Sequence, residues 1–306
     1  MATTLTEYAK LSNDVMKAGV IQTIIKDNPL LQLLPWVEIN GNALTYNRES
    51  TIPLAEWHLS NDDWSTSPNL TFVQKTATLY ILGQNADVDN YAKQTRSNIN
   101  DLKSVTIEST SKAIRNELEL TLLYGNNATS PKQFDGLIKL IDTGTASDQV
   151  IAAGATGGVA LTLTLLDSLI DAVIGGKPDL LLMHVKTRRK LTDLARAAGS
   201  NLTFTNIFGD QVDVYNGIPI QTSNLIKTTH TLSGSVETAY TGGASNTIYA
   251  IRFGEDALCG LTGGGGMQII PIGDLETKDA ERTRIKMYCG LVLFSQLTCA
   301  ALIGIA

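Results

Sequence analysis

The sequence has few charged residues, and this shortage already narrows the range of functions. Charged side chains make up 18% of the 306 residues, compared with roughly 25% in a typical soluble domain. So little charged surface favours an assembly in which large areas are covered by neighbours. Apolar residues make up 43% of the chain, which supports a folded protein, and its length allows two subdomains.

Positive charge is scarce as well. The formal net charge is −6 and the pI is about 5.1, whereas proteins that recognise nucleic acid usually present one basic face. The cluster of Lys186, Arg188, Arg189 and Lys190 is typical of the solvated start of a short helix. These features argue against sequence-specific recognition of nucleic acid and leave only weak, non-specific contact with it.

Cysteine and histidine are also rare. Cys259, Cys289 and Cys299 lie in apolar surroundings, and their odd number indicates buried free thiols in a reducing compartment. None of them has the local signature of a catalytic nucleophile, and the three histidines are too far apart in sequence to show metal-ligand spacing. We therefore expect no catalytic site, no cofactor and no metal site.

Targeting and membrane segments are not expected either. The first ten residues lack the apolar core of a signal peptide. Residues 287–306 carry no charge and are long enough to span a bilayer, but Gly290, Gln296 and Gly304 interrupt the run. We expect two strands there, the first of them buried on both faces. The four glycines of 263–266 lack the ending of a phosphate loop and precede a strand pattern, so we expect a plain turn.

The most prominent feature that the sequence does contain is a helical pattern over residues 97–125. It has no proline and no internal glycine, with Ser97 as the expected N-cap and Gly125 as a left-handed C-cap. The residues that share its apolar face are Ile107, Ile114, Leu118 and Leu122. At about 1.5 Å per residue the helix would be roughly 40 Å long, so it needs a sheet or another helix along its whole length.

Residues 1–40 are expected to form an N-terminal arm. The arm ends in the apolar stretch LLQLLPW, which has few partners nearby in sequence. Such an arm is stable only when it packs on its own chain or on a neighbour. Its candidate interface residues are Leu30, Leu31, Leu33 and Leu34.

Residues 41–82 predict an extended hairpin loop. Two alternating runs, after Gly41 and over 70–82, flank a long polar and aromatic tip. A hairpin this long cannot bury both faces against its own chain, so Trp57 and Trp64 are expected to contact a neighbour. The alternative is that both tryptophans pack locally within the tip. Further interface candidates are Arg48, Glu49, Asp62 and Asp63.

An ion site on the hairpin tip is a second interpretation of the same residues. His58, Asp62 and Asp63 together could hold a divalent cation. A solvated acidic loop is the simpler interpretation, and we prefer it.

Residues 142–265 alternate helix and strand patterns, which indicates an α/β subdomain. Within it we expect a helix capped by Thr164, a buried strand at 179–185 with His184 as a core histidine, and a hairpin turn at Asn216 and Gly217. The C-terminal strands should then pair with the segment at 79–88.

The order of these parts resembles the major capsid protein of tailed bacteriophages, as do the stretches VDVYNGIPIQTS and RIKMYCGLVLFSQLTCAALIGI. The resemblance implies an α+β capsid shell fold that is shared with encapsulins. It divides the chain into an arm (1–40), an extended hairpin loop (41–82), a peripheral domain with a spine helix (83–141 and 266–306) and an inserted axial domain (142–265).

The resemblance also implies a function. Subunits would form pentamers and hexamers of an icosahedral shell around a viral genome, assembled in the host cytoplasm. A portal and a scaffolding protein would be partners, and a decoration protein could be another. The chain would not be an enzyme. Some relatives cross-link through a hairpin lysine, but 51–69 contain none, so we expect no cross-link. The short arm favours a separate scaffolding protein. An encapsulin-type nanocompartment and a soluble α/β enzyme are the alternatives.

Overall fold

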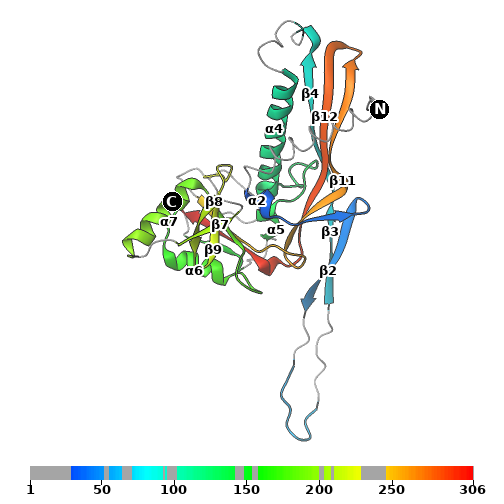
Figure 1. Cartoon of the computed structure of the whole chain (residues 1–306). Coiled ribbons are helices and arrows are strands. Elements are labelled where there is room, and N and C mark those ends of the chain that lie inside the picture. The colour runs from blue at the N-terminus through cyan, green and yellow to red at the C-terminus, as the bar shows by residue number, and fades with distance from the viewer. Residues whose placement is uncertain are drawn as a thin grey trace, which may run out of the picture.

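The computed structural model describes residues 29–51, 55–63, 71–91, 94, 102–141, 148–153, 158–199, 203–207, 210–228 and 246–305. Residues 1–28 of the expected arm, and Trp64, lie outside this part of the chain. The described residues confirm the mixed α+β fold. A long helix lies along a tall sheet, a second sheet with its helices lies beside the lower part of both, and a hairpin projects away from the body (Figure 1).

Helix α4 (Leu102–Tyr124) is the long helix that the sequence predicts. Its apolar stripe is confirmed, because the four predicted residues are between 1% and 6% exposed. They pack in one cluster with residues of the tall sheet, among them Ala86 and Ile285. The expected cap at Ser97 lies outside the described residues.

Gly125 follows α4 for a different reason from the one we expected. Its backbone does not adopt a positive φ, so it is not a left-handed cap. Its N–H donates to the Thr121 carbonyl over 2.8 Å, and its carbonyl accepts from the Gly136 N–H over 2.8 Å. A Cβ at Gly125 would lie 2.2 Å from the Phe134 carbonyl oxygen. Close approach of the next segment therefore requires glycine here.

The tall sheet has four strands in the order β1-β11-β12-β4. They are β1 (Trp36–Ile39), β11 (Leu258–Leu275), β12 (Lys278–Leu293) and β4 (Tyr80–Asp89). The antiparallel pairing of β12 with β4 runs from Tyr80 opposite Cys289 to Asp89 opposite Ala280. This confirms the predicted pairing of the C-terminal region with the segment at 79–88.

The four glycines at 263–266 lie inside β11, so the predicted turn is wrong. Pairing with β12 is regular up to Thr262 opposite Cys289 and resumes at Met267 opposite Met287. Four residues of β11 thus face one residue of β12. Gly265 and Gly266 have φ values of 94° and 54°, which glycine adopts without strain. The glycines form a bulge that interrupts the pairing within one long strand.

The second sheet has seven strands in the order β5-β13-β10-β6-β9-β8-β7. Helices α6 (Leu163–Asp171) and α7 (Val185–Ala197) lie beside it in Figure 1. The strands are β5 (Val150–Ala152), β6 (Leu180–Met183), β7 (Thr203–Ile207), β8 (Asp210–Tyr215), β9 (Ile218–Thr222), β10 (Asn246–Ile251) and β13 (Cys299–Ile305). Its two faces contribute to different apolar clusters, one shared with α4 and one shared with α6 and α7.

The strand pairing differs from the expected division of the chain at two places. The last strand, β13, pairs with β10 and β5 in the seven-stranded sheet and not with the sheet of β4. Conversely, β11 begins at Leu258 and belongs to the four-stranded sheet. The position of β13 was not predicted because this strand is apolar on both faces. Such a run indicates burial without indicating which sheet receives the strand.

Local predictions in the inserted segment had mixed outcomes. Asn216 and Gly217, with φ of 50° and 80°, form the predicted turn between β8 and β9. His184 is not a core residue: it is the half-buried N-cap of α7, and its Nδ1 accepts from the Lys186 N–H over 3.1 Å. Helix α6 is capped by Thr162, two residues before the expected Thr164. Strand β7 was not predicted.

The three cysteines are buried free thiols, as predicted. Burial raises the pKa of Cys289 and of Cys299 to about 12, so both thiols are protonated and unreactive at neutral pH. Within the described ranges, no helix is both long and apolar enough to cross a membrane.

A buried carboxylate joins α4 to the seven-stranded sheet. Glu119, 5% exposed, accepts a hydrogen bond from the hydroxyl of Ser223, just after β9. The Ser223 N–H donates to the Met183 carbonyl of β6 over 3.1 Å. Burial raises the pKa of Glu119, and the Ser223 hydrogen bond and the Arg115 charge oppose that rise. The ionised form is therefore the less favourable one at this junction.

We predict that Glu119→Gln stabilises the subunit progressively more as the pH rises. A raised folded pKa means that Glu119 contributes stability below its ordinary value of 4.5, and that this contribution is lost as the pH rises through the folded pKa. Glutamine stays neutral and still accepts from Ser223. Thermal unfolding should show parent and variant alike at about pH 4 and the variant more stable at about pH 7. The exposed Glu117→Gln serves as the control, and a pH-independent difference would contradict the prediction.

Candidate assembly surfaces

The projecting hairpin is a two-stranded ribbon. Strands β2 (Ala43–Thr51) and β3 (Thr71–Thr78) pair from Ala43 opposite Thr78 to Thr51 opposite Thr71. The alternating run predicted at 70–82 is divided at Leu79, so that β3 and β4 belong to different sheets. An isolated two-stranded ribbon is at best marginally stable in water. Its stability must therefore come from its base or from a surface that covers it.

Arg48, which lies opposite Val73 in the ribbon, fastens the ribbon to the end of β12. Its Nε donates to the Phe294 carbonyl over 2.7 Å, and its Nη2 donates to the Leu293 carbonyl. The Tyr46 hydroxyl donates to the Leu293 carbonyl over 3.1 Å, and its ring lies edge-on to Phe294 with centroids 5.1 Å apart. We expected Arg48 to pair with a neighbour, but its guanidinium is bound within its own chain.

Strand β3 and the tip of the hairpin expose large apolar side chains. Phe72 and Val73 of β3 are 60% and 43% exposed, and Trp57 and Leu59 at the tip are 102% and 81% exposed. Trp57 is therefore not packed against the described residues of the tip. Large apolar side chains exposed together on one projecting element are typical of a surface that another molecule covers.

The carboxylates of the hairpin are exposed and have different roles. Asp62 shapes the tip, since its Oδ2 accepts from the Leu59 N–H over 2.9 Å next to Asn61, whose φ is 77°. Asp63 and Glu49 point to solvent. In the described part of the chain, no group of three or more His, Cys, Asp or Glu residues is arranged to hold a metal ion.

The leucines of the arm pack within their own subunit. Leu30, Leu31 and Leu34, in and just after helix α2 (Pro29–Leu33), are 2%, 5% and 4% exposed and belong to the cluster that contains Leu118 of α4. Leu33 is half-buried against the same cluster. Of the two options that the sequence left open, burial in the chain's own core is the one observed.

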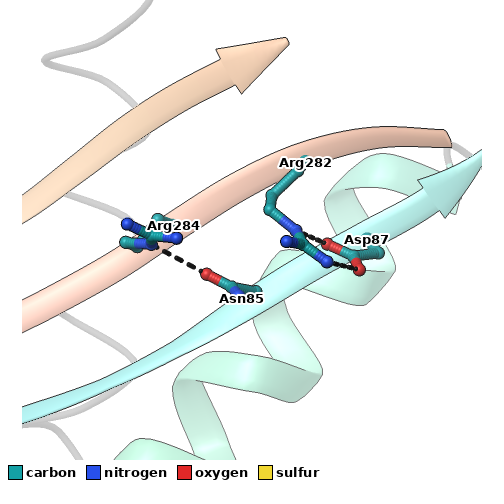
Figure 2. Close-up of polar contacts among 4 residues, drawn as sticks. All are labelled: Asn85, Asp87, Arg282 and Arg284. Atoms are coloured by element: carbon teal, nitrogen blue, oxygen red, sulfur yellow. Dashed lines mark hydrogen bonds and ion pairs between the residues drawn. The ribbon is translucent and has the colours of Figure 1, made fainter. Parts of the chain in front are cut away.

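A second candidate surface is the polar face of the four-stranded sheet, which lies opposite α4. Arg282 of β12 grips Asp87 of β4 with two hydrogen bonds of 2.6 Å, and the Arg284 Nε donates to the Asn85 Oδ1 over 3.0 Å (Figure 2). The ion pair lowers the pKa of Asp87 and raises that of Arg282. This surface was not predicted from the sequence, although the alternating cations of TRIKMY on β12 indicate a charged strand face.

The arrangement of these parts defines a class of protein, the shell-forming proteins of phage capsids and encapsulins. Solved structures share the fold over most of both chains. The holo-SrpI encapsulin complex from Synechococcus elongatus matches with a TM-score of 0.67 and 17% identity, covering 91% of this chain and 88% of that one. The capsid of the native GTA particle matches with a TM-score of 0.63 and 12% identity, covering 93% and 91%. A chain of Mycobacterium phage Bobi matches with a TM-score of 0.59 and 16% identity, covering 90% and 89%.

The family model of the SU10 major capsid protein matches residues 3–306. The chain belongs to the SU10 major capsid protein family. No curated protein matches the sequence. Family membership makes this a structural shell protein and favours the capsid over the encapsulin alternative that the sequence left open.

We predict that Arg48→Ala loosens the hairpin from the body. The substitution leaves two carbonyls at the end of β12 without their charged donor, and such hydrogen bonds contribute about 1.5–3 kcal/mol. Amide hydrogen exchange of β2 and β3 should become faster while that of α4 is unchanged. Lys75→Ala, on the exposed face of β3, is the matched control. Equal exchange rates in Arg48→Ala and in the parent would show that other contacts hold the ribbon to the body.

Proposed function

We propose that the chain assembles as pentamers and hexamers into a closed icosahedral shell around a viral genome. Membership of a major capsid family supports a shell, and the symmetry of its capsomers is our inference from the shared fold. In this proposal the protein has no catalytic role and resides in the virion capsid after assembly in the host cytoplasm.

The exposed apolar side chains of the hairpin are the observation that supports the proposal most directly. The hairpin leaves the body and exposes Trp57, Leu59, Phe72 and Val73 without a cover in the described part of its own chain. A monomer with that surface would be prone to associate. We propose that the hairpin lies over a neighbouring subunit, and that the inserted domain faces the local symmetry axis.

Many weak contacts can then hold a stable shell. Each subunit in a closed shell makes the same contacts with several neighbours, and contacts made together add avidity far beyond any single one. The arrangement of the parts in Figure 1 suits contacts with several neighbours, because the hairpin and the inserted domain extend to different sides of the long helix. We keep the proposed division of the chain into arm, hairpin, peripheral domain and axial domain, except that β13 belongs to the seven-stranded sheet of the axial domain.

Partners other than the chain itself are part of the proposal. A separate scaffolding protein and a portal would be needed to close a genome-filled shell, and a decoration protein could add to its outer surface. Because 51–69 contain no lysine, we propose that the hairpin holds its neighbour without a covalent cross-link through a lysine of that segment. Packaged DNA would be touched only non-specifically.

Negative-stain electron microscopy with sedimentation tests the proposal. The purified chain, alone and co-expressed with candidate scaffolding proteins from the same genome, should form closed particles tens of nanometres across. Particles that contain a cargo protein and no portal would support the encapsulin alternative. A monomer that never assembles under either condition would contradict the shell and reopen the α/β enzyme alternative.

We predict that Trp57→Ala combined with Trp64→Ala gives a folded subunit that assembles poorly. Removing large aromatic anchors at an interface typically costs at least about 2 kcal/mol per contact, and the loss recurs at every neighbour. Circular dichroism should match the parent, while particle yield in sedimentation should fall at least about tenfold. Ser60→Ala, also at the tip, is the control. Normal particles from the double variant would show that the tip is no anchor.

A further inference from the structure

The open face of the four-stranded sheet carries a graded ladder of side chains. Four residues of β12 alternate along this face, and each lies opposite one residue of β4. The pairs are Arg282 with Asp87, Arg284 with Asn85, Lys286 with Gly83, and Tyr288 with Ile81. Along the ladder the partner therefore changes from a carboxylate to an amide, then to no side chain, then to an apolar side chain.

Two cations of the ladder have no compensating carboxylate among the residues that the structure describes. Arg282 and Asp87 neutralise each other (Figure 2). Exposed Arg284 has the neutral Asn85 as its partner, and the Lys286 Nζ donates to the Tyr288 hydroxyl over 3.0 Å and lies 5.2 Å from that ring. Hydrogen bonds to neutral groups hold both cations in place and leave their charge available to an anion.

A shallow hollow lies at these two cations. It has a volume of about 430 Å³ and is lined by Ile81, Gly83, Gln84, Asn85, Arg284, Lys286 and Tyr288. Gly83 places no side chain on the floor of the hollow. A Cβ at this position would lie 2.7 Å from the Ile285 carbonyl oxygen, so a larger residue would not fit without a shift. Apolar side chains flank the cations, with Ile81 73% exposed on β4 and Ile270 38% exposed on β11. The hollow thus combines two positive charges with apolar edges.

The hairpin tip has the complementary composition. Residues 51–69 contain three acidic side chains, Glu56, Asp62 and Asp63, and no lysine or arginine. Trp57 and Leu59 stand exposed beside them. Acidic and apolar groups on the tip match cationic and apolar groups in the hollow in sign and in kind.

A subunit cannot make this contact with itself. In Figure 1 the hairpin tip and the paired strands β4 and β12 extend in opposite directions from the body. The tip can reach such a hollow only on a second copy of the chain.

We propose that the hollow around Arg284 and Lys286 receives the acidic, aromatic hairpin tip of a neighbouring subunit. This rests on the proposed shell function and names the surface that the hairpin covers. Opposite charges steer the tip to the hollow, and the apolar edges then bury the exposed side chains of the tip. The pairing also gives the shell a directional order, since each subunit offers one tip and one hollow.

Charge reversal and rescue test the proposal. The hollow variant is Arg284→Glu with Lys286→Glu, the tip variant is Glu56→Lys with Asp63→Lys, and the third variant combines both. Asp62 is kept because it shapes the turn. All substituted side chains except that of Lys286 are exposed, and circular dichroism checks each subunit. The control is Lys278→Glu, an exposed position on the same strand beyond Arg282.

Each single-surface variant should lower particle yield at least about tenfold, and the combined variant should recover to within about threefold of the parent. The control should assemble normally. The losses should shrink in high salt, which screens repulsion between like charges. Rescue is decisive, since a merely damaged fold would be worse in the combined variant.

Other outcomes separate the inference from the function on which it rests. If the parent forms particles and the tip variant does not, but the hollow variant assembles normally, the hairpin anchors elsewhere and the inference is wrong. Particles of the hollow variant that assemble normally but hold less packaged DNA than the parent would mean that the hollow binds phosphates, which also overturns the inference. Failure of the parent to assemble both alone and with scaffolding proteins would contradict the shell function.

Discussion

The packing of α4 against one face of the four-stranded sheet is the constraint on which the other parts depend. The helix presents an apolar stripe along its length, and the sheet supplies Ala86 and Ile285 to cover it. Burying that stripe fixes β4 and β12 side by side and decides which face of the sheet is covered. The opposite face, with its charged ladder, is left to solvent or to a partner. The same packing brings α2 and the arm leucines into the core.

The seven-stranded sheet is attached to this unit by shared core and by chain path. One face of β6, β10 and β13 contributes Leu182, Tyr249 and Ala301 to the cluster of α4, whereas the other face packs with α6 and α7. The chain passes from β12 into β13 through one short 3-10 turn, Gln296–Thr298. Glu119 and Ser223 add a polar link at the same junction. The two sheets are therefore coupled through a common core, and a movement of one would disturb the packing of the other.

The hairpin is the exception, because its described residues are fastened to the body only along the paired strands. Arg48 and Tyr46 hold the ribbon to the carbonyls of Leu293 and Phe294. The ribbon nevertheless exposes nearly every residue of β3. A protein that worked as a monomer would gain nothing from this surface and would risk aggregation. In the proposed shell the same surface would be an interface between subunits, which agrees with membership of a major capsid family.

The sequence predicted those elements whose signals are local. The apolar spacing of α4, the Asn216 and Gly217 turn and the alternating strands of the hairpin each follow from residues close together in the chain. Features set by distant neighbours were missed. The sheet that receives β13, the contacts of Arg48 and the capping role of His184 depend on segments that are far away in sequence. The glycines at 263–266 misled because a glycine run signals a turn, whereas pairing on both sides turns it into a bulge.

The charged ladder illustrates the same limit for the assembly surfaces. Alternating cations on β12 were visible in the sequence, but their partners on β4 lie about 200 residues away in the chain. Only the strand register shows that Arg282 is neutralised and that Arg284 and Lys286 are not. By contrast, exposed Trp57 could be anticipated, since a long tip between two strands has little of its own chain to pack against.

A cryo-electron microscopy reconstruction of the assembled particle would test the central claim most directly. The claim is that a neighbouring subunit covers the surface that the hairpin exposes. The account predicts that density for the hairpin tip crosses a subunit boundary and that Trp57 is buried against the adjacent chain. A hairpin folded onto its own subunit, or projecting into solvent in a closed particle, would contradict the account.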